Sequence, residues 1–436
     1  MDESTDSTMG LKIPETVYPP REDTRLMIDS LVSPVCENGR ALEIGSGSGA
    51  VSISLAEKGW SVTAIDVNPM AVAATRANTK DIGGYEVDCI EGSFDEISAL
   101  REGMFDLIVW NMPYIGAPPE PPSLEAIEES SMIDTGYGGW ASELRAYLMD
   151  HPSMLSPDGA VVLLYRTHPE SPSKPGEWVR DGWATRTISS LFVGREKLEV
   201  VGHWRPGLNK VPFHLSEVDS TMEYEFPEKS RFERVFTGNQ TSGRGRRSAE
   251  WVTDPAGIAA TWRISGMHGL APGILQIGVG AALSSAFAMH LKWPNDVVDS
   301  RYRKCGGVLS ELQSDESVKI GVGMNRFGQY IPGVETTGWD ASLPALSKSA
   351  AVCVADAAVA SALDAHPLIG SPDSENLRSF AWKEVSEVLS RGHSAVVNGT
   401  CKRVVGIEEN GEILLAGNSS VKSISEVDRI SWKLAT

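Results

Sequence analysis

Apolar and polar stretches alternate over residues 40–205 in the manner of strands separated by helices. Apolar runs of strand length recur at residues 41–44, 62–65, 105–109 and 160–164. Between them, residues 50–58 and 70–78 have the composition of helices. This alternation predicts an α/β domain built on a doubly wound, mostly parallel sheet. Ligands of such sheets bind at the carboxyl ends of the strands, so the residues that follow these strands are candidates for a site.

The pattern changes after about Val211, where glycine-rich loops, long helices and a closing series of short strands follow one another. The uncharged stretch over residues 274–291 contains Gln276 and His290, so we expect a buried core helix there and not a membrane span. Short strands are predicted near the C-terminus at residues 394–397, 402–407, 413–416 and 421–424. Asn410-Gly411 is typical of a hairpin turn between two of them.

The length and the change of pattern together predict the domain organisation. A chain of 436 residues is long enough for about three domains at roughly 150 residues each. The segment Arg205-Pro206-Gly207-Leu208 is rich in proline and glycine and marks the change of pattern. We therefore predict a first domain over residues 1–207, a second over residues 208–392 and a small β domain over residues 393–436.

Composition and charge exclude several classes of protein. With 41% hydrophobic and 22% charged residues, the chain is expected to be globular and neither disordered nor fibrous. The formal net charge of −19 disfavours nucleic acid as a partner, because phosphates would be repelled outside a local basic patch. The opening residues Met1-Asp2-Glu3-Ser4 contain no apolar run, so we expect no signal peptide and a cytoplasmic location.

The cysteines are spread along the chain and form no C-x-x-C pair, which predicts reduced, buried thiols with neither a disulfide framework nor a zinc site. They are Cys36, Cys89, Cys305, Cys353 and Cys401.

A glycine-rich loop follows the first predicted strand, where Gly45, Gly47 and Gly49 alternate after Glu43. Glycines let the backbone approach a ligand closely, and the N-terminus of the following helix adds partial positive charge. Asp66 ends the second predicted strand, where a carboxylate can accept hydrogen bonds from both ribose hydroxyls. Together these features favour a nucleoside-containing cofactor such as NAD or S-adenosylmethionine.

The segment Asn111-Met112-Pro113-Tyr114 follows the strand at residues 105–109. It resembles the Asn-Pro-Pro-Tyr motif of class I methyltransferases that modify planar nitrogen groups. An amide side chain and a backbone carbonyl can accept hydrogen bonds from an amino group while the aromatic ring stacks on its plane, which is a positioning effect. Upstream, residues 17–24 (VYPPREDT) resemble the release factor glutamine methyltransferase type, and the resemblance covers about residues 14–200.

The resemblance implies a Rossmann-like domain that transfers a methyl group from S-adenosylmethionine to a protein acceptor, such as a release factor. It places Asn111 and Tyr114 at the reaction centre. The residues that it assigns to S-adenosylmethionine are Thr24, Glu43, Gly45, Gly47, Gly49, Asp66, Ser93 and Asn111. This chain departs from the family's pattern at Met112, which replaces a proline, and at Ser93, which stands where an acidic residue usually faces adenine.

Five segments of the second half carry further candidate chemistry. Arg244, Arg246 and Arg247 lie in one glycine-arginine loop, where guanidinium groups can bind phosphates through paired hydrogen bonds. The other segments are Asp219-Ser220-Thr221, Lys292-Trp293-Pro294-Asn295-Asp296, Lys304-Cys305-Gly306-Gly307 and Gly321-Val322-Gly323-Met324-Asn325. In their order and approximate spacing, the five segments resemble the biotin protein ligases over about residues 213–436.

That resemblance implies an α+β catalytic domain of the biotin/lipoate-ligase type and a small C-terminal SH3-like β-barrel. It further implies that ATP activates biotin to biotinyl-AMP, and that the biotin then passes to a lysine of a biotin carboxyl carrier protein or domain. Mg²⁺ is expected with ATP, although the sequence does not indicate its ligands. Nothing upstream resembles a helix-turn-helix, so we expect no binding to operator DNA, and we expect no membrane partner.

The resemblance also assigns roles to particular residues. Charge that develops on carboxylate and phosphate oxygens requires fixed cations, and we expect Lys292, Arg244 and Arg246 to supply them. The residues assigned to biotin are Ser220, Thr221, Gln240, Gly243, Gly306 and Gly307. Those assigned to ATP are Arg244, Arg246, Arg247, Trp251, Lys292, Asn295 and Asn325.

Several alternatives remain open at this point. Trp251 and Trp293 could contact the ligand or pack in the core. Asp296 could contact the ligand or only hold the loop that carries Lys292. Ser248-Ala249-Glu250 departs from the polar, arginine-containing sequence of many family members. Three hypotheses follow: a fusion with two active enzymes, a biotin ligase whose N-terminal half only binds a partner or cofactor, or a methyltransferase with a degenerate ligase-like half.

Overall fold

The computed structural model describes residues 10–116, 133–227, 230–246, 250–417, 421–424 and 430–433. The chain forms two compact units. Unit 1 comprises Met1–Trp178, Thr185–Asn209 and His366–Gly370. Unit 2 comprises Val179–Ala184, Lys210–Ala365 and Ser371–Thr436.

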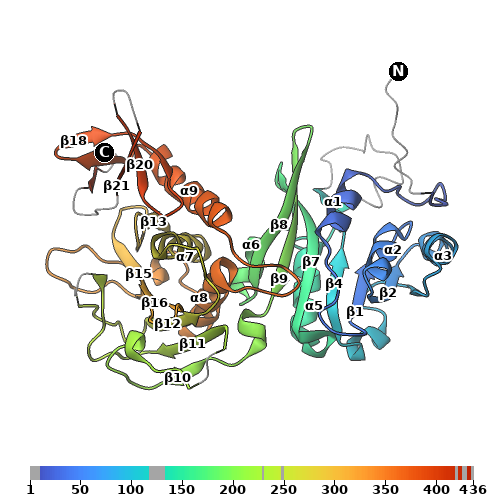
Figure 1. Ribbon diagram of the computed structural model, residues 1–436, viewed down its shortest axis with the longest axis horizontal. Helices are drawn as coiled ribbons and strands as arrows, with labels where there is room; N and C mark the ends of the chain where they lie inside the picture. The colour runs from blue at the N-terminus through green and yellow to red at the C-terminus, as the bar shows by residue number, and fades with distance from the viewer. Residues whose placement is uncertain are drawn as a thin grey trace. The chain divides into compact units, whose positions relative to one another are not determined.

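Unit 1 is built on a seven-stranded sheet. In sheet order its strands are β3 (Asp88–Glu91), β2 (Ser61–Asp66), β1 (Arg40–Ile44), β4 (Phe105–Trp110), β7 (Leu155–His168), β9 (Glu196–Trp204) and β8 (Ala184–Val193). The pairs from β3 to β7 are parallel, and β7 pairs with β9 in antiparallel register (Figure 1). The predicted doubly wound, mostly parallel sheet is therefore confirmed, because each predicted strand lies inside β1, β2, β4 or β7.

The described α-helices of the first part of the chain are α1 (Glu22–Ser30), α2 (Ala50–Glu57), α3 (Pro69–Asn78), α5 (Trp140–Asp150) and α6 (Gly176–Arg180). Short helical turns are η1 (Thr79–Gly83), η2 (Ser98–Glu102), η3 (Pro152–Met154) and η4 (Pro206–Asn209), and β5 (Ile115–Gly116) pairs with β6 (Ile133–Asp134). The helices α2 and α3 connect β1 to β2 and β2 to β3, so the loop after each strand opens at the same edge of the sheet.

Unit 2 is built on a second seven-stranded sheet, in which all pairs are antiparallel except the parallel pair at one edge. In sheet order its strands are β10 (Phe213–Leu215), β11 (Phe232–Thr237), β12 (Ile258–Ile264), β16 (Val318–Met324), β15 (Lys304–Leu312), β14 (Asp296–Val298) and β13 (His290–Lys292). Its helices are α7 (Pro272–Ala286), α8 (Lys348–Leu363) and α9 (Ser374–Ser390), with the short turns η5 (Thr221–Glu223) and η7 (Trp339–Ala341). Helix α7 packs against α8, α9 and β15.

The predicted core helix at residues 274–291 is confirmed only as far as Ala286. Helix α7 is buried on nearly all its sides, as its lack of charge predicts. The last predicted residues instead form strand β13, because Ala288 adopts a left-handed φ of 52° that ends the helix and turns the chain.

A buried ion pair joins the sheet of unit 2 to α8. Arg234 Nη1 donates to Asp356 Oδ2 over 2.7 Å, and Trp262 Nε1 donates to Asp356 Oδ1 over 2.9 Å. Burial raises the pKa of the Asp356 carboxyl, while Arg234 and Trp262 oppose that shift. The carboxylate therefore accepts hydrogen bonds from two buried donors that lie far from it in the sequence.

Replacing Asp356 with alanine is expected to lower the free energy of unfolding by about 3–5 kcal/mol, because it leaves the Arg234 guanidinium buried without its carboxylate. Urea unfolding followed by circular dichroism measures the change. The matched control is Glu335→Ala, which removes an exposed carboxylate and should stay within about 0.5 kcal/mol. An equal effect of the two substitutions would contradict this account.

The described C-terminal residues form two separate three-stranded sheets. One contains β18 (Thr400–Lys402), β17 (Ser394–Val397) and β22 (Ile430–Lys433), and the other β19 (Val404–Ile407), β20 (Ile413–Ala416) and β21 (Val421–Ile424). The single strand predicted at residues 402–407 is wrong, since Arg403 separates β18 from β19. Gly411, with a φ of 87°, makes the predicted turn between β19 and β20. No pairing joins the two sheets in the described part of the C-terminus, so a closed SH3-like barrel is not confirmed.

The cysteines are unpaired, but the prediction that all of them are buried is wrong. Cys89 and Cys305 are buried, whereas Cys36, Cys353 and Cys401 are exposed. The local sequence does not indicate this difference, because the burial of a thiol depends on what packs over it. Among the described helices, none combines the length and the apolar character needed to cross a membrane.

Candidate functional sites

In unit 1, the glycine loop and Asp66 form one structure at the carboxyl ends of β1 and β2. Gly45 and Gly47 have left-handed φ values of 68° and 54°. A Cβ on Gly45 would lie 3.1 Å from Trp110 Nε1, so the loop passes close over the end of β4. Asp66 Oδ2 accepts a hydrogen bond from Gly47 N over 2.9 Å, and Oδ1 accepts one from Asn68 N over 2.8 Å. The carboxylate is thus held beside the loop, and each oxygen keeps a lone pair for a hydroxyl donor.

Glu43 lies below this loop and is 3% exposed. Ser52 of α2 donates a short hydrogen bond to its carboxylate. Burial raises the pKa of Glu43 to about 8, which the Ser52 hydrogen bond only partly offsets. The sequence assigned Glu43 to the cofactor, and in the structure its carboxyl braces the start of α2 from inside.

The raised pKa of Glu43 predicts a pH dependence of stability. The folded chain holds this proton more tightly than the unfolded chain, so the contribution is fully present below about pH 4.5 and is lost as pH rises through about 8. Glu43→Gln should remove that loss and stabilise unit 1 well above pH 8 by about 5 kcal/mol relative to the wild type. Urea unfolding at pH 5, 7 and 9 measures it. The control Glu57→Gln changes an exposed carboxylate of α2, and parallel pH profiles for all three proteins would refute the prediction.

Asn111 follows directly after β4, at the same edge of the sheet. Its Nδ2 donates to Asp23 Oδ2 over 3.2 Å, while its Oδ1 is buried and accepts no hydrogen bond from the described residues. Tyr114 is 6% exposed, and burial raises the pKa of its phenol, so the ring stays neutral. Met112, in place of the family's proline, is 1% exposed and anchors the segment in the core. The segment can therefore present an amide oxygen and an aromatic ring to a planar nitrogen group.

Thr24 and Ser93 contribute hydroxyls that are already engaged by carboxylates. Thr24 Oγ1 donates to Asp23 Oδ1 over 3.2 Å, and Ser93 donates a short hydrogen bond to Asp95. Asp95 thus supplies a carboxylate two residues after the position where the family usually has one. No motif assigned a role to Asp23 or Asp95, although Asp23 stands in the VYPPREDT segment directly before Thr24.

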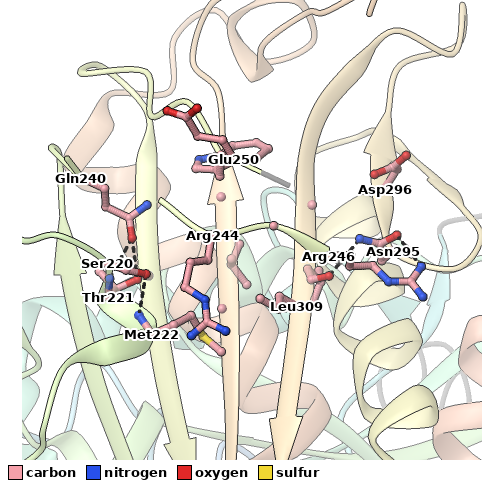
Figure 2. Close-up of a pocket in the computed structure, with 18 of the residues that line it drawn as sticks. Ser220, Thr221, Met222, Gln240, Arg244, Arg246, Glu250, Asn295, Asp296 and Leu309 are labelled. Carbon is pink, nitrogen blue, oxygen red and sulfur yellow. Dashed lines mark hydrogen bonds between the residues drawn. The ribbon is translucent and has the colours of Figure 1, made fainter. Parts of the chain in front are cut away.

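Unit 2 contains a cavity of about 280 Å³ between η5, the glycine-arginine loop and the sheet. This volume is close to the lower end of the range for small-molecule sites, roughly 300–1,000 Å³. Of the predicted residues, those that line it are Ser220, Thr221, Gln240, Arg244, Arg246, Trp251, Asn295 and Gly307. Figure 2 places Ser220, Thr221 and Gln240 on one side, with Arg246, Asn295 and Asp296 on the other.

The first side of the cavity is a hydroxyl and amide cluster. Gln240 Oε1 accepts from Thr221 N over 2.8 Å and from Thr221 Oγ1 over 3.1 Å. Thr261 Oγ1 donates to Thr221 Oγ1 over 2.9 Å. Ser220 Oγ caps η5 by accepting from Met222 N over 3.3 Å. These bonds fix neutral donors and acceptors at the wall, which suits a polar, uncharged head group.

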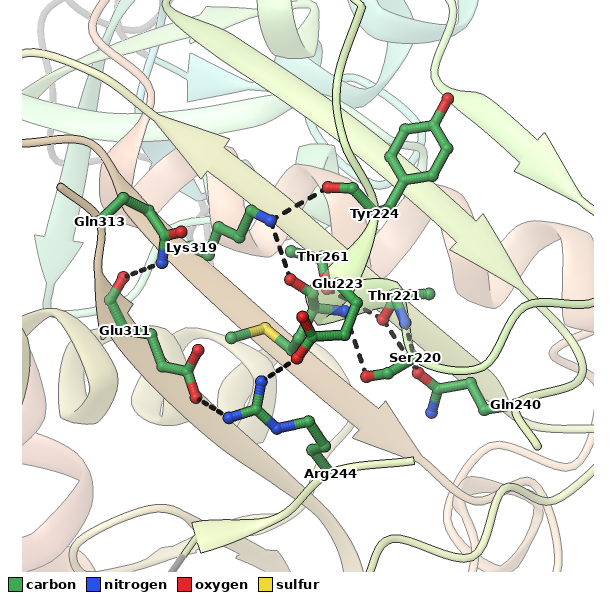
Figure 3. A network of polar contacts seen from close by, with 11 residues as sticks. Ser220, Thr221, Glu223, Tyr224, Gln240, Arg244, Thr261, Glu311, Gln313 and Lys319 are labelled. Atoms are coloured by element: carbon green, nitrogen blue, oxygen red, sulfur yellow. Dashed lines mark hydrogen bonds and ion pairs between the residues drawn. The ribbon is translucent and has the colours of Figure 1, made fainter. Parts of the chain in front are cut away.

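Lys319, which belongs to none of the predicted site residues, supports this cluster from behind. Its Nζ donates to the carbonyl oxygens of Met222 and Tyr224 over 2.9 and 3.0 Å, at the end of η5 (Figure 3). The residue is 7% exposed. Lys319 lies on β16, about a hundred residues from η5 in the chain. No local sequence motif therefore predicts this contact.

The opposite side of the cavity is charged, with the cations Arg246 and Lys304 and the carboxylate of Asp296. Arg246 Nη1 donates to Asn295 Oδ1 over 3.4 Å, and Asn295 Nδ2 donates to Val308 O over 3.0 Å, so the loop arginine is tied to the sheet. Asp296 binds two lysines, with Lys304 Nζ at 2.7 Å from Oδ1 and Lys292 Nζ at 3.4 Å from Oδ2. Lys304, which was not assigned a role, lines the cavity together with Asp296.

Arg244 is shared between two carboxylates. Its guanidinium makes a short contact with Glu223 and donates to Glu311 Oε1 over 2.9 Å (Figure 3). Glu223 belongs to η5 and Glu311 to β15. An anionic ligand would therefore compete with these carboxylates for Arg244.

The predicted glycines divide between the cavity and the packing around it. A Cβ on Gly307 would meet nothing closer than 3.7 Å, so this position is open. A Cβ on Gly306 would come within 2.3 Å of Met324 Sδ, and one on Gly243 within 2.4 Å of Trp251 O. Gly323 leaves room for the Trp251 ring, which a Cβ would meet at 2.3 Å.

Some predicted residues lie elsewhere. Lys292, Gly243, Gly306 and Asn325 are not among the described residues that line the cavity. Asn325 is 2% exposed, and its backbone nitrogen donates to Cys305 O over 2.8 Å. Trp293 is buried, and its Nε1 donates to Gly411 O over 2.9 Å, which fits core packing. Arg247 lies outside the described residues.

Comparison with known proteins identifies a methyltransferase domain family that matches residues 41–130. Human methyltransferase HEMK2 is 30% identical over 203 residues, which are 42% of this chain and 88% of the human protein. A protein of Methanocaldococcus jannaschii named as a protein N5-glutamine methyltransferase is 29% identical over 203 residues, 45% of this chain and 95% of that protein. The release factor glutamine methyltransferase of Shewanella oneidensis is 36% identical over 104 residues, only 36% of its length.

Solved structures of biotin protein ligases are among those that this chain resembles, and each matches about half of the chain. The Aquifex aeolicus biotin protein ligase in complex with biotin and ATP is 23% identical, with a TM-score of 0.37, and covers 52% of this chain and 100% of that structure. The Leishmania major enzyme in complex with biotinyl-5-AMP is 18% identical, with a TM-score of 0.33, and covers 49% of this chain and 98% of that structure.

Proposed function

This chain belongs to the methyltransferase family that includes human HEMK2, and from that premise we propose that its N-terminal half methylates a side-chain nitrogen of a protein glutamine. The observation that carries the proposal is the meeting of the glycine loop, Asp66 and Asn111 at one edge of the sheet. The glutamine acceptor is taken from the names of the relatives, and a release factor is the partner that those names suggest.

The residues of unit 1 have separate tasks in this reaction. S-adenosylmethionine, when bound, supplies an electrophilic methyl group on a sulfonium. Asp66 is placed to accept the ribose hydroxyls, and the glycine loop lets the backbone approach the ligand. Asn111 Oδ1 is placed to accept an N–H of the acceptor amide, while Tyr114 packs against its plane. In the transfer, the amide nitrogen would form the new bond to carbon as the sulfur–carbon bond breaks, S-adenosylhomocysteine would leave as a neutral thioether, and the proton lost from nitrogen would pass to water.

For the C-terminal half we propose a biotin protein ligase, so that the chain is a fusion of two enzymes over the domains 1–207, 208–392 and 393–436. The carrying observation is one cavity in which a neutral hydroxyl and amide wall faces a charged wall with Arg246 and Asp296 (Figure 2). Biotin fits this division, since its ureido head is neutral and its carboxylate is charged. The five sequence segments that resemble the family support the same assignment.

The proposed ligase reaction has two steps. The head group binds Ser220, Thr221 and Gln240, and the biotin carboxylate attacks the α-phosphate of ATP, giving biotinyl-AMP and pyrophosphate. Arg246 and Lys292 stabilise the charge on the reacting oxygens. A lysine of a biotin carboxyl carrier protein or domain then attacks the mixed anhydride and releases AMP. Mg²⁺ is expected to accompany ATP, and its ligands are not assigned.

Biotin-dependent ATP–pyrophosphate exchange by the full chain tests the ligase proposal. Exchange that requires biotin, and that lipoate does not support, is the expected result. Folded protein that gives no exchange would remove the ligase assignment and leave the methyltransferase as the activity of this chain. Transfer of labelled methyl groups to peptides that differ only in a central Gln, Asn or Ala tests the other half, and labelling of the Gln peptide alone is expected.

A further inference from the structure

We propose that Asp23 is a positioning and specificity-determining residue that fixes the amide of Asn111, so that only an acceptor with an N–H donor fits the methyltransferase site. This inference rests on the proposed methyltransferase function and goes beyond it, since no motif assigns Asp23 a role. Asp23 lies in the first turn of α1, 88 residues before Asn111 in the chain.

The chemistry of the contact determines which way the Asn111 amide faces. An ionised carboxylate only accepts hydrogen bonds, so the group of Asn111 that faces Asp23 must be the NH₂ group. The observed contact has this orientation, with Nδ2 donating to Asp23 Oδ2 over 3.2 Å. The Oδ1 atom therefore points away from Asp23, and it is buried without a hydrogen-bond donor among the described residues. Such an acceptor is costly to bury unless a bound molecule donates to it.

Asp23 is itself held in place. It is 5% exposed, and its Oδ1 accepts from Thr24 N over 2.6 Å and from Thr24 Oγ1 over 3.2 Å. These bonds occupy Oδ1 and leave Oδ2 for Asn111. Thr24 is one of the residues predicted to contact the cofactor, so the same short segment connects the cofactor side of the site to the amide of Asn111.

Tyr114 is a second residue that the charge of Asp23 affects. Burial raises the pKa of its phenol most, and the charge of Asp23 raises it further. Asp23 is hydrogen-bonded to Asn111, and Tyr114 follows Asn111 in the same segment. Because Asn111 Oδ1 points away from Asp23, Asp23 acts on the acceptor only through its effect on the orientation of the Asn111 amide.

The orientation has a consequence for specificity. An acceptor amide offers N–H groups that can donate to Asn111 Oδ1, whereas an ester or ketone of the same shape cannot. Without Asp23, the Asn111 amide could rotate by 180° and present its NH₂ group instead, which would favour a carbonyl oxygen. The wild type should therefore discriminate strongly between a Gln peptide and its glutamate γ-methyl ester analogue, which acts only as a competitor.

The test uses the full chain with Asp23→Leu, Asp23→Asn and the control Asp29→Asn, which changes an exposed carboxylate of the same helix. Asp23→Leu is expected to lower kcat/KM for the Gln peptide by about 10–100-fold, since misplaced catalytic groups cost rate at this scale. Asp23→Asn can still accept through its own amide oxygen and should fall between Asp23→Leu and the wild type. Binding of S-adenosylmethionine, measured by calorimetry, and the Tm should match the wild type in all three.

Inhibition by the ester peptide gives a readout that a merely structural role would not move. The ratio of the Ki of the ester peptide to the KM of the Gln peptide should fall towards one in Asp23→Leu. The same ratio should stay unchanged in Asp29→Asn. Unchanged discrimination and unchanged kcat/KM in Asp23→Leu would overturn the proposal. A loss of kcat/KM that is accompanied by an equal loss of thermal stability or of cofactor affinity would overturn the proposal as well.

A final measurement separates this proposal from the proposed function. In chain labelled with ¹⁵N-asparagine, the Asn111 side-chain amide is identified by its absence in Asn111→Ser. Its hydrogen exchange should accelerate by at least about tenfold in Asp23→Leu, as for loss of a hydrogen bond to a charged group. If the wild type methylates no peptide but this exchange difference holds, the acceptor assignment fails and the orientation stands. Equal exchange rates would overturn the orientation whatever the activity.

Discussion

Replacing Lys292 with alanine is expected to lower biotin-dependent ATP–pyrophosphate exchange by at least about 100-fold, or about 2.7 kcal/mol of barrier. Adenylation places negative charge on carboxylate and phosphate oxygens at once, and a fixed cation stabilises both. Lys292 lies at the end of β13, with its Nζ 3.4 Å from Asp296 Oδ2. Asp296 lines the cavity and Lys292 does not, so Lys292 is connected to the cavity through this contact with Asp296.

The two lysines that share Asp296 make the experiment sharper. Lys304 Nζ is 2.7 Å from the same carboxylate and lines the cavity directly. We expect Lys292→Ala to act on the rate of exchange, and Lys304→Ala to act mainly on the KM for ATP or biotin. Lys422→Ala is the matched control, because it removes one exposed positive charge from β21. Exchange at the wild-type rate in Lys292→Ala would contradict the assignment and transfer the role to Lys304 and Arg246.

Replacing Asn111 with alanine is expected to lower methyl transfer to a Gln peptide by about 100–1,000-fold, the range found when one preorganised polar group is removed from a reaction centre. The substitution removes the amide oxygen that would receive the acceptor N–H. Affinity for S-adenosylmethionine should change much less, because Asp66 and the glycine loop remain. Transfer of labelled methyl groups at saturating cofactor measures the effect.

Asn111→Asp provides the sharper comparison for the same position. It keeps an oxygen acceptor but places a second carboxylate beside Asp23, where like charges repel and one must bind a proton. We expect its activity to be as low as that of Asn111→Ala at neutral pH and to recover partly when the pH is lowered. Wild-type transfer by either variant would rule out Asn111 as the group that orients the acceptor.

Local sequence patterns predicted the elements that hold the sites. The alternation of apolar runs located β1, β2, β4 and β7, because a strand or helix is recognised from neighbouring residues. The topology of a doubly wound sheet then brings the strand ends together, which places the glycine loop beside Asp66 and Asn111. The turn at Gly411 followed in the same way from its two residues.

Local patterns predicted less well where burial or distant packing decides the outcome. The core helix was predicted too long, since nothing in the apolar run marks the left-handed turn at Ala288. The continuous strand expected at residues 402–407 is divided at Arg403. The predicted burial of all cysteines failed for a similar reason, because exposure depends on which surface another segment covers.

The sequence alone thus determined which residue types are present and which strand or loop carries each. Only the tertiary structure decided their partners. Asp23 meets Asn111 across 88 residues, Arg244 meets Glu311 across 67, and Lys319 meets Met222 across 97. Periodicity and turn chemistry act over a few neighbouring residues. Hydrogen bonds between distant segments depend on the register of the sheets and the burial of the groups, and no local motif contains that information.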